Sequence, residues 1–537
     1  MSKNKFYVTT PIYYVNWIPH IGHFYSSVIA SILARYNKVS WKQTRFTTWV
    51  DENSQKAVKI AEERKMDIME YLDEMSVSHK KVWDFFSFPY TDFIRTTEKR
   101  HHNLVKEVLQ KVYDRWDIYE WVYKGMYCVW CEAFKKDDDL IDLDWVKVCS
   151  DHLTEPDKIN EKNYFFKLSR YQKWLEEFYE ANPDFVMPDF RFNEVREFVK
   201  RWLEDFSISR ETNKFWVKLP FDDQQVAYVW FDALYNYYTS CKYSRAWDKD
   251  SENFIDETDF WPADLHVVWK DIIRFHAIYW PAMLASYFDL WEEKDGVLHY
   301  KKTDKERLPK NILTTWFFTI DWQKISKSLW NVIEPVDYSK KYSKDLLTLY
   351  ILSAFPIWND GDFDRKDAIL TYNAKLANNL WNLVNRVVVL SLKLKDESWK
   401  LYWDINQDWF YEKNISWILN KYTEAIKNYD LKSSLDYCFI LTDILNKFAD
   451  EKQPWISVKN DTEWTRWVLY TLADSLRQVW LCLYPFFPEK MTEMFEKLWL
   501  ENYKEILESG GMKTLQDKKE IYNIKDKWEP LFKRLDT

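Results

Sequence analysis

The sequence predicts an α/β protein: a Rossmann-like parallel sheet, interrupted by an inserted module and followed by an α-helical bundle. Strand-like and helix-like segments alternate in the N-terminal part, which is typical of a parallel sheet covered by helices. Short segments with paired cysteines interrupt this alternation, and long helical stretches come after it. A chain of 537 residues is long enough for two or three such domains.

The alternation begins close to the N-terminus. Residues 6–10 are predicted to form a buried strand, and the proline-containing loop Pro11–Pro19 follows it. Apolar residues at helical spacing predict a helix from about His20 to Tyr36. Residues 45–48 are a second predicted strand, and a charged amphipathic helix is expected from Asp51 onward.

The pattern changes over residues 116–225, where short segments and an acidic run indicate an inserted module. The α/β pattern resumes near Val226 and continues through the apolar residues 265–268 and the helical stretch Ile272–Leu284. After about residue 345 the chain consists of long helical stretches with few strand signals, which predicts a helix bundle.

The composition limits the class of protein. Hydrophobic residues make up 47% and charged residues 30%, which excludes a disordered chain. The absence of a long apolar run and of a signal peptide predicts a cytoplasmic protein without a membrane partner. The net charge of −9 is weak evidence against a nucleic-acid partner, because a whole-chain value can hide a local basic face. Six cysteines in a reducing compartment are better interpreted as thiols and metal ligands than as disulfides.

Glycine and tryptophan occur in abnormal numbers. Glycine occurs 6 times, whereas a usage of roughly 7% gives about 38, and tryptophan occurs 32 times. The two counts together equal the expected glycine count, and many tryptophans stand at turn positions that favour glycine. Our hypothesis is that glycine codons are rendered as tryptophan, through UGA codons that variant genetic codes reassign to either residue. The alternative is a protein with an unusually tryptophan-rich core.

The first motif that indicates chemistry lies at the start of the first predicted helix. His20, Gly22 and His23 follow the first strand of an α/β sheet, where backbone N–H groups and the helix dipole favour a phosphate. Gly22 would let a nucleotide approach the backbone closely, and the two imidazoles could donate to developing phosphate charge. The alternative is a pair of histidines at a helix start without a function.

The second motif is Lys324-Ile325-Ser326-Lys327-Ser328. Two lysines with small hydroxyls between them suit a mobile loop that clamps a pyrophosphate, although a basic pentapeptide alone could be a solvated surface loop. The two motifs together resemble the HIGH and KMSKS sequences of class I aminoacyl-tRNA synthetases, in the same order.

The resemblance to methionyl-tRNA synthetases extends over nearly the whole chain. It rests on the opening segment Thr9–Asn16 and on Val229–Leu234, Lys270–His276 and Tyr279–Leu284. Two departures are Asn53-Ser54, where the family has His-Gly, and Ile325, where Met is common. The resemblance implies a ligase that activates L-methionine with Mg²⁺-bound ATP and loads it onto tRNA(Met), initiator tRNA included.

The resemblance also implies roles for individual residues. His20, His23, Lys324 and Lys327 would be catalytic, and Gly22, Asp271 and Lys327 would bind ATP. Asp51 would pair with the substrate ammonium, unless it is only the N-cap of the helix expected there. The methionine side chain would lie among mostly apolar and aromatic residues, which suit a thioether: Ile12, Tyr14, Trp230, Ala233, Leu234, Tyr237 and His276.

A zinc site is predicted from ligand spacing. Cys128-x2-Cys131 and Cys149-x2-His152 are separated by seventeen residues, and such pairs form a closed Cys3His site for one structural Zn²⁺. The resembling family has such a knuckle in its inserted module.

An RNA-reading face is predicted in the helical region. Asn378, Asn382 and Arg386 are spaced four apart, and Trp455 follows in a loop, so an aromatic ring and polar groups could read a single-stranded RNA loop. The resemblance implies that these positions form the anticodon-reading surface. The alternative is ordinary helix polarity.

The resulting domain prediction has five segments. They are the first catalytic half (1–115), the inserted zinc module (116–225), the second catalytic half (226–320), the KMSKS and stem-contact region (321–365) and the anticodon-binding bundle (366–537). The resemblance favours a monomer.

Several rival functions explain the motifs less well. The inserted module is small for the editing domain of leucine, isoleucine or valine enzymes. A cysteine enzyme would place zinc ligands in the substrate pocket. A catalytically inactive tRNA-binding paralogue would not need both histidines and both lysines, and a zinc-dependent nucleic-acid-binding protein leaves the α/β motifs unexplained.

The same resemblance divides the tryptophans. Trp230, Trp261, Trp280 and Trp455 fall where the family has an aromatic ring. The suspected glycine positions fall where it has glycine or a small residue: Trp17, Trp49, Trp130, Trp202, Trp269, Trp322, Trp330 and Trp381.

Overall fold

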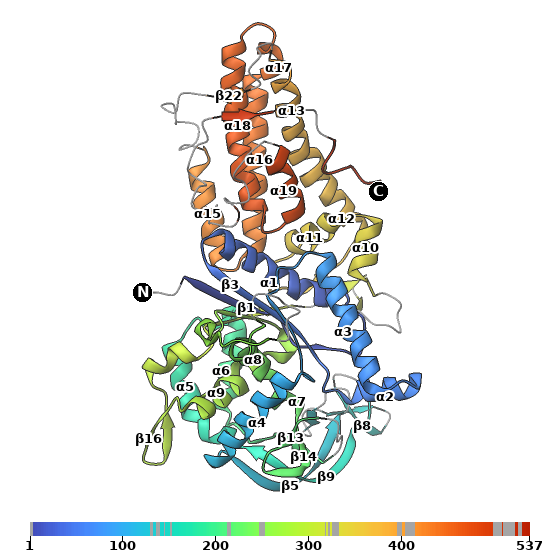
Figure 1. The fold of residues 1–537 in the computed structure, drawn as a ribbon, viewed down its shortest axis with the longest axis vertical. Coiled ribbons are helices and arrows are strands. Elements are labelled where there is room, and N and C mark those ends of the chain that lie inside the picture. The colour runs from blue at the N-terminus through green and yellow to red at the C-terminus, as the bar shows by residue number, and fades with distance from the viewer. Residues whose placement is uncertain are drawn as a thin grey trace.

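The structure is a computed structural model of the chain. It describes residues 4–128, 133–135, 140–143, 145–150, 153–211, 216–245, 253–316, 318–320, 323–324, 332–394, 400–402, 414–497, 507, 521–524 and 529–536. The α/β body lies at one end of an elongated molecule and a tall helical bundle at the other (Figure 1). No helix among these residues is long and apolar enough to cross a membrane.

A seven-stranded sheet organises the α/β body, and every strand pair in it is parallel. This confirms the α/β fold with a parallel sheet. The order is β10-β18-β15-β1-β3-β2, with β4 also paired to β3. The strands are β1 (Lys5–Thr9), β2 (Tyr13–Tyr14), β3 (Gln43–Asp51), β4 (Asp92–Arg95), β10 (Val186–Met187), β15 (Leu265–Trp269) and β18 (Asn311–Thr315).

Strand β1 lies in the middle of this sheet. Val8 pairs with Phe46 of β3 on one side and with Leu265 of β15 on the other, so both edges of the strand are hydrogen-bonded. A strand buried in this way needs apolar residues in succession, which the FYVT run supplies. The strand predicted over residues 6–10 is therefore present.

Helix α1 (Ile21–Val39) connects the sheet to the bundle. Nearly all of its side chains are buried, because the sheet lies on one side of it and the helical part on the other (Figure 1). Arg35 donates to the carbonyl of Ser87 at 2.7 Å and to that of Pro485, on the bundle side, at 3.1 Å. The helix predicted from His20 is thus the element that joins the two parts.

The helix expected from Asp51 starts later than predicted. Asp51 is the last residue of β3, and α2 runs over Gln55–Arg64 with Ser54 as its N-cap. The Ser54 side chain accepts from the backbone N–H of Lys56 at 3.2 Å. Asp51 is therefore not the helix cap, which removes that alternative for its carboxylate.

Antiparallel strands dominate the segment after α4 (Lys99–Asp114). The long strands β5 (Ile118–Cys128) and β9 (Asp157–Phe166) pair at the far end of the body (Figure 1). Strand β10, from the same segment of the sequence, nevertheless pairs with β18 in the central sheet. The segment thus also contributes an edge strand of the central sheet.

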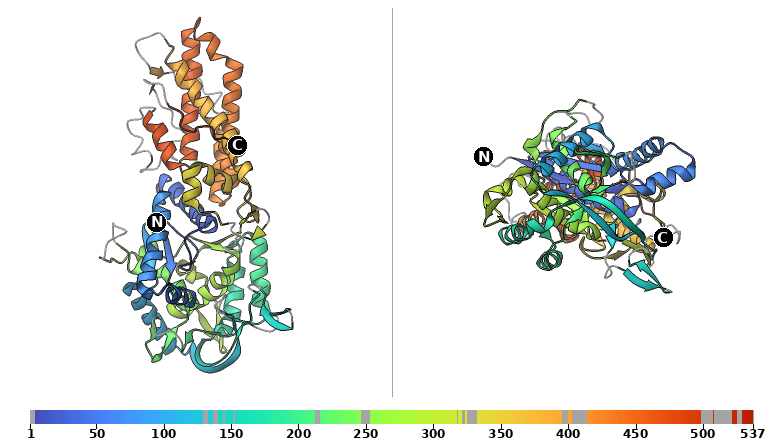
Figure 2. Two further views of the ribbon diagram at one scale, coloured as in Figure 1. Left: turned by 90° about the vertical axis from the view of Figure 1, so that its right-hand side faces the viewer. Right: turned by 90° about the horizontal axis from the view of Figure 1, so that it is seen from below.

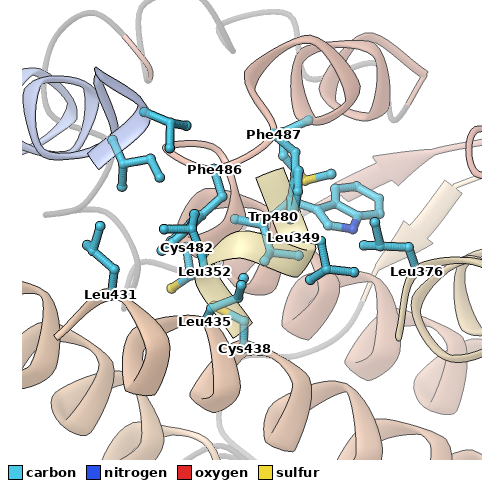
Figure 3. Packing of buried hydrophobic residues seen from close by; sticks show 14 of the residues in the cluster. Leu349, Leu352, Leu376, Leu431, Leu435, Cys438, Trp480, Cys482, Phe486 and Phe487 are labelled. Atoms are coloured by element: carbon cyan, nitrogen blue, oxygen red, sulfur yellow. The ribbon is translucent and has the colours of Figure 1, made fainter. Parts of the chain in front are cut away.

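The C-terminal part is a bundle of long helices, in agreement with the prediction (Figure 2). Its main helices are α13 (Asn382–Ser391), α16 (Leu431–Lys452) and α18 (Thr462–Leu483), and α11 (Lys344–Ser353) lies at its base. Leucines of α11 and α16 pack with Trp480 and Cys482 of α18 in a continuous apolar core (Figure 3). Buried residues of α1 belong to the same apolar core, so the bundle is packed against the sheet through α1.

Candidate functional site

The two histidines of the first motif lie together at the start of α1. His20 is the N-cap, and its ring lies 4.1 Å from the ring of His23, centroid to centroid. The backbone N–H of Gly22 donates to Nδ1 of His20 at 3.0 Å, and the backbone N–H of His20 donates to Nδ1 of His23 at 3.3 Å. Both Nδ1 atoms are acceptors, so each neutral ring has its proton on Nε2 and can donate it outward.

Burial fixes the charge state of His23. Burial, and next the neighbouring His20 and His79, hold the pKa of His23 well below its usual range. His23 is therefore neutral at neutral pH and acts as an N–H donor, not as a cation. Gly22 stands between the two histidines, where a Cβ would lie 2.9 Å from Cε1 of His20. The capping arrangement therefore leaves little room for a larger residue at position 22.

The lysine-containing segment lies partly within the described chain. Lys324 is in β20 (Gln323–Lys324), whose backbone pairs with Thr319 of β19 (Phe318–Ile320). Lys327 lies outside the described residues. The backbone N–H of Ile21 donates to the carbonyl of Ile333 at 3.1 Å. The chain that follows the lysine segment thus returns to the start of α1.

A buried aromatic cluster lies at the carboxyl edge of the sheet, where the methionine pocket is predicted. The hydroxyl of Tyr237 lies 2.7 Å from Nε2 of His276, and the Trp230 ring stacks on Phe275 at 3.6 Å. Tyr14 meets the edge of Trp230 at 6.5 Å. One apolar cluster contains or contacts the predicted pocket residues other than His276: Ile12, Tyr14, Trp230, Ala233, Leu234 and Tyr237. The structure therefore brings the predicted methionine-binding residues together.

The two predicted acidic site residues differ in their surroundings. Asp51 is fully buried, and its Oδ1 accepts from the backbone N–H of Asn53 at 2.9 Å and lies 3.5 Å from the Thr96 hydroxyl. Asp271 is exposed, in a short 3-10 helix after β15. Asp51 is therefore held in one orientation by its neighbours.

The structure adds a polar pair that the sequence did not single out. Asn53 donates to Oδ2 of Asp232 at 2.7 Å, and both side chains are buried. Burial raises the pKa of Asp232 well above its usual range. Both residues line a cavity of about 10 Å³ beside the pocket. The departure Asn53 was noted in the sequence, but its partner lies 179 positions away and only the fold reveals it.

Two of the four predicted zinc ligands can be placed. Cys128 ends β5 and Cys149 ends β8 (Val146–Cys149), and both side chains are buried. Cys131 and His152 lie outside the described residues. Within the described ranges, no group of three or more His, Cys, Asp or Glu side chains is placed to hold a metal ion.

Two of the predicted RNA-reading residues, Arg386 and Trp455, lie together in the bundle. The guanidinium of Arg386 lies 5.8 Å from the Trp455 ring centroid and 3.1 Å from Asp450. These three residues line a cavity of about 350 Å³ together with Asn385, Val389 and Leu390. Sequence spacing did not indicate Asn385, which precedes Arg386 in the same helix.

Asn378 and Asn382 are exposed and do not line this cavity. Asn378 lies in the π-helical stretch Asn373–Trp381, directly before α13. A π-helix has more residues per turn than an α-helix, so the spacing of four from Asn378 to Asn382 no longer marks one face.

Comparison with known proteins agrees with this geometry. The family of tRNA synthetases class I (M) matches residues 6–388. The methionine–tRNA ligase of Thermotoga maritima is 35% identical over 541 residues, covering 99% of this chain and 81% of that protein. The enzyme of Bacillus subtilis is also 35% identical, covering 100% and 79%.

The chain belongs to the methionyl-tRNA synthetase family. A solved structure of the Mycobacterium tuberculosis methionyl-tRNA synthetase in complex with methionyl-adenylate matches with a TM-score of 0.87 and 28% identity. The match covers 99% of this chain and 100% of that one. The resemblance to class I synthetases for methionine is confirmed, and with it the expectation of an aminoacyl-tRNA ligase.

Proposed function

We infer that this chain activates methionine with ATP and transfers the methionyl group to tRNA. The observation that supports this most directly is the placement of two histidines at a helix start and a buried aromatic cluster at the same sheet edge. In open α/β sheets ligands bind outside the carboxyl ends of the strands. A relative of the same fold has methionyl-adenylate bound.

In the first step the methionine carboxylate attacks the α-phosphate of ATP in line, and pyrophosphate leaves with its magnesium ion. The Nε2–H groups of His20 and His23 donate to the phosphate oxygens as negative charge develops there. Gly22 lets the nucleotide approach, Asp271 contacts the adenosine side, and Lys324 and Lys327 neutralise the leaving pyrophosphate. In the second step the 2′-hydroxyl of the terminal adenosine of tRNA attacks the carbonyl carbon of methionyl-adenylate, the new ester forms, and AMP leaves.

Methionine is recognised at both of its ends. The buried carboxylate of Asp51 pairs with the substrate ammonium, since a cation that loses its water needs a charged partner. Trp230 and Tyr237 pack against the thioether, together with the apolar residues of the pocket. Methionine-dependent exchange of pyrophosphate into ATP tests this function. Exchange that depends on another amino acid would contradict it.

Lys327 provides a sharper test of the first step. We expect Lys327→Ala to lower the exchange rate by several orders of magnitude while the affinity for methionine stays nearly unchanged. The reason is that the ammonium meets charge that develops only on the transferring phosphates. Near-normal exchange by this variant would remove Lys327 from the catalytic set.

The inserted module is proposed to hold one structural zinc ion through Cys128, Cys131, Cys149 and His152. Buried thiols at the ends of β5 and β8 suit thiolate ligands, and four protein ligands leave no open position for catalysis. Metal analysis after purification without chelators should give one zinc per chain, lost in Cys128→Ser. A protein that is active without bound metal would contradict the proposed zinc site.

The bundle is proposed to read the anticodon of tRNA(Met), including the initiator tRNA, through Arg386 and Trp455. Their shared cavity of about 350 Å³ has the size of a site for an unstacked base.

The enzyme is proposed to act as a monomer in the cytoplasm, with the five domain segments predicted above.

We further propose that some tryptophans stand where the working protein has glycine. The 6 glycines and 32 tryptophans together match a normal glycine usage of roughly 7%.

A further inference from the structure

Four tryptophans have the backbone conformation of glycine. Among the described residues, eleven that are not glycine have positive φ, and four of them are tryptophans: Trp41 at 68°, Trp116 at 62°, Trp145 at 68° and Trp202 at 70°. A large side chain is rarely found in this left-handed region, where glycine is favoured and Asn or Asp is tolerated. Tryptophan should therefore be rare in this set.

Two of these residues terminate helices in a motif that glycine dominates. After α1, the N–H of Trp41 donates to the carbonyl of Lys38 at 3.2 Å, and the N–H of Lys42 donates to that of Asn37 at 3.0 Å. This is the pair of hydrogen bonds of a Schellman motif, with Trp41 at the left-handed C′ position.

Trp116 repeats this motif after α4. Its N–H donates to the carbonyl of Tyr113 at 2.9 Å, and the N–H of Asp117 donates to that of Val112 at 3.3 Å. Glycine is strongly enriched at this position because it has no Cβ to clash with the backbone. The same tight helix end therefore recurs with the same unexpected residue.

Trp202 and Trp145 occupy two further glycine positions. Trp202 follows the C-cap Arg201 of α6 (Asp189–Lys200). Trp145 lies in the two-residue connection of a hairpin in which Leu143 pairs with Val146, and such connections favour Asp-Gly. The side chains of Trp116, Trp145 and Trp202 are 79%, 102% and 83% exposed, so packing does not compensate for their conformation.

Two other tryptophans fill the substrate site. Trp49 is completely buried, and its ring lies 5.1 Å from that of Tyr237, centroid to centroid, while its Nε1 donates to the carbonyl of Thr10. Trp269 ends β15 at the carboxyl edge of the sheet, and its ring lies 5.4 Å from that of His23. One indole thus stands against the amino-acid pocket and the other against the nucleotide end.

The small cavity lined by Asn53 and Asp232 does not extend to either indole, since neither Trp49 nor Trp269 lines it. The cavity beside Asn53 and Asp232 has a volume of about 10 Å³, which is at most the room for one water molecule. Methionine and an adenine ring each need far more. Glycine at 49 and 269 would free the volume of one indole beside Tyr237 and of another beside His23.

We propose that the working protein has glycine at 41, 116, 145 and 202, where the backbone conformation favours it, and at 49 and 269, where an indole occupies the substrate site. The first set rests on backbone geometry alone. The second set rests on the proposed function, because it assigns the freed space to methionine and to the adenine of ATP.

Sequencing the gene and the native protein tests the residue identities directly. The six positions should be encoded by UGA, and mass spectrometry of peptides from the native protein should show glycine at each. Trp280 is the control: it is buried, its Nε1 donates to His266 at 3.3 Å, and we expect UGG and tryptophan there. Tryptophan at 41, 116, 145 and 202 in the native peptides would overturn the proposal.

Recombinant variants test the consequence for the site. The chain as written is compared with Trp49→Gly/Trp269→Gly in methionine-dependent pyrophosphate exchange, with the same amount of folded protein in each assay. We expect the double variant to exceed the chain as written by at least about 100-fold, since substrates that cannot be positioned do not react. Equal rates would overturn the assignment of 49 and 269.

Two further variants distinguish the effect of freed volume in the substrate site from the effect of relieved backbone strain at the helix ends. Trp41→Gly/Trp116→Gly should raise the thermal unfolding midpoint without restoring exchange, whereas Trp280→Gly should lower the midpoint. Suppose that the native peptides contain glycine but that pyrophosphate exchange by the glycine-containing enzyme depends on an amino acid other than methionine. In that case the proposed function fails while the residue assignment stands.

Discussion

The hydroxyl of Tyr237 donates to Nε2 of His276 across 2.7 Å inside the buried pocket. The direction of this bond follows from the other ring nitrogen, because Nδ1 of His276 lies 3.0 Å from the carbonyl of Ile272 and must be the one that has the proton. His276 is neutral, since burial lowers its pKa to about 4. Two residues from different elements therefore form one rigid wall of the pocket.

Removing this hydroxyl should weaken methionine binding. In Tyr237→Phe the buried Nε2 of His276 loses its donor, which costs about 1–3 kcal/mol and frees the ring to move. We expect the KM for methionine in pyrophosphate exchange to rise about tenfold, with a smaller change in kcat.

Tyr235→Phe is the matched control for this variant. Tyr235 is equally buried and its hydroxyl donates to the carbonyl of Met283 at 3.2 Å, away from His276. It should lower the free energy of unfolding without changing the KM. An unchanged KM in Tyr237→Phe would contradict a role for this residue in the pocket.

His20 allows the capping role to be separated from the catalytic one. In His20→Asn the side-chain oxygen can still accept from the N–H of Gly22, but no imidazole N–H remains for the phosphate. We expect the kcat of exchange to fall about 10²–10³-fold, the effect of removing one donor to a developing oxyanion, at nearly unchanged stability.

His20→Ala removes both functions of the residue. It should show the same loss of kcat and in addition lose about 1 kcal/mol of unfolding free energy, because the cap is absent. A kcat for His20→Asn close to that of the unchanged enzyme would mean that His20 is only a helix cap.

The catalytic sheet was predictable because its signals are local. The FYVT run of β1 and the loop-to-helix junction at His20 and His23 each lie within a few adjacent residues, and parallel topology then determines where they meet. The start of α2 was misplaced because the sequence contains several acceptable caps. Ser54 caps the helix, while Asp51 remains part of β3.

The rest of the site depends on contacts between distant segments. The bond between Asn53 and Asp232 joins residues 179 positions apart, and no local pattern marks it. In the bundle, spacing by four indicated Asn378, but this residue lies in the π-helical stretch before α13, which alters the helical face. Asn385 lines the cavity instead.

Trp455 should contribute to tRNA recognition without affecting methionine activation. Its ring is 38% exposed and forms part of the cavity with Arg386, so a base could stack on it. We expect Trp455→Ala to weaken tRNA binding by about 1–3 kcal/mol while methionine-dependent exchange stays unchanged.

Ile456→Ala provides the comparison for Trp455. Ile456 is 53% exposed, follows Trp455 directly and does not line the cavity, so this variant should bind tRNA normally. Equal aminoacylation of tRNAs with altered anticodons would contradict the assignment of this face.

Buried neutral histidines should make the fold sensitive to acid. Burial lowers the pKa of His79 to about 4 from 6.5, and its Nδ1 lies 3.0 Å from the carbonyl of Met75. The unfolded chain binds a proton below pH 6.5, whereas the folded chain does not until about pH 4. The stability from this group is therefore complete above pH 6.5 and is lost as the pH falls through that window, by about 1.4 kcal/mol per pH unit.

His79→Gln isolates this effect, because the glutamine amide can still donate to Met75 and does not titrate. Between pH 7.5 and 5.0 the loss of unfolding free energy should be smaller in the variant by about 2 kcal/mol, measured by urea denaturation at each pH. Asp345 is half-buried, and loss of solvation raises its pKa to about 6, which acts in the opposite direction. The quantity to compare is therefore the difference between His79→Gln and the unchanged chain. If His79→Gln loses as much stability as the unchanged chain over this range, His79 is not the group that titrates.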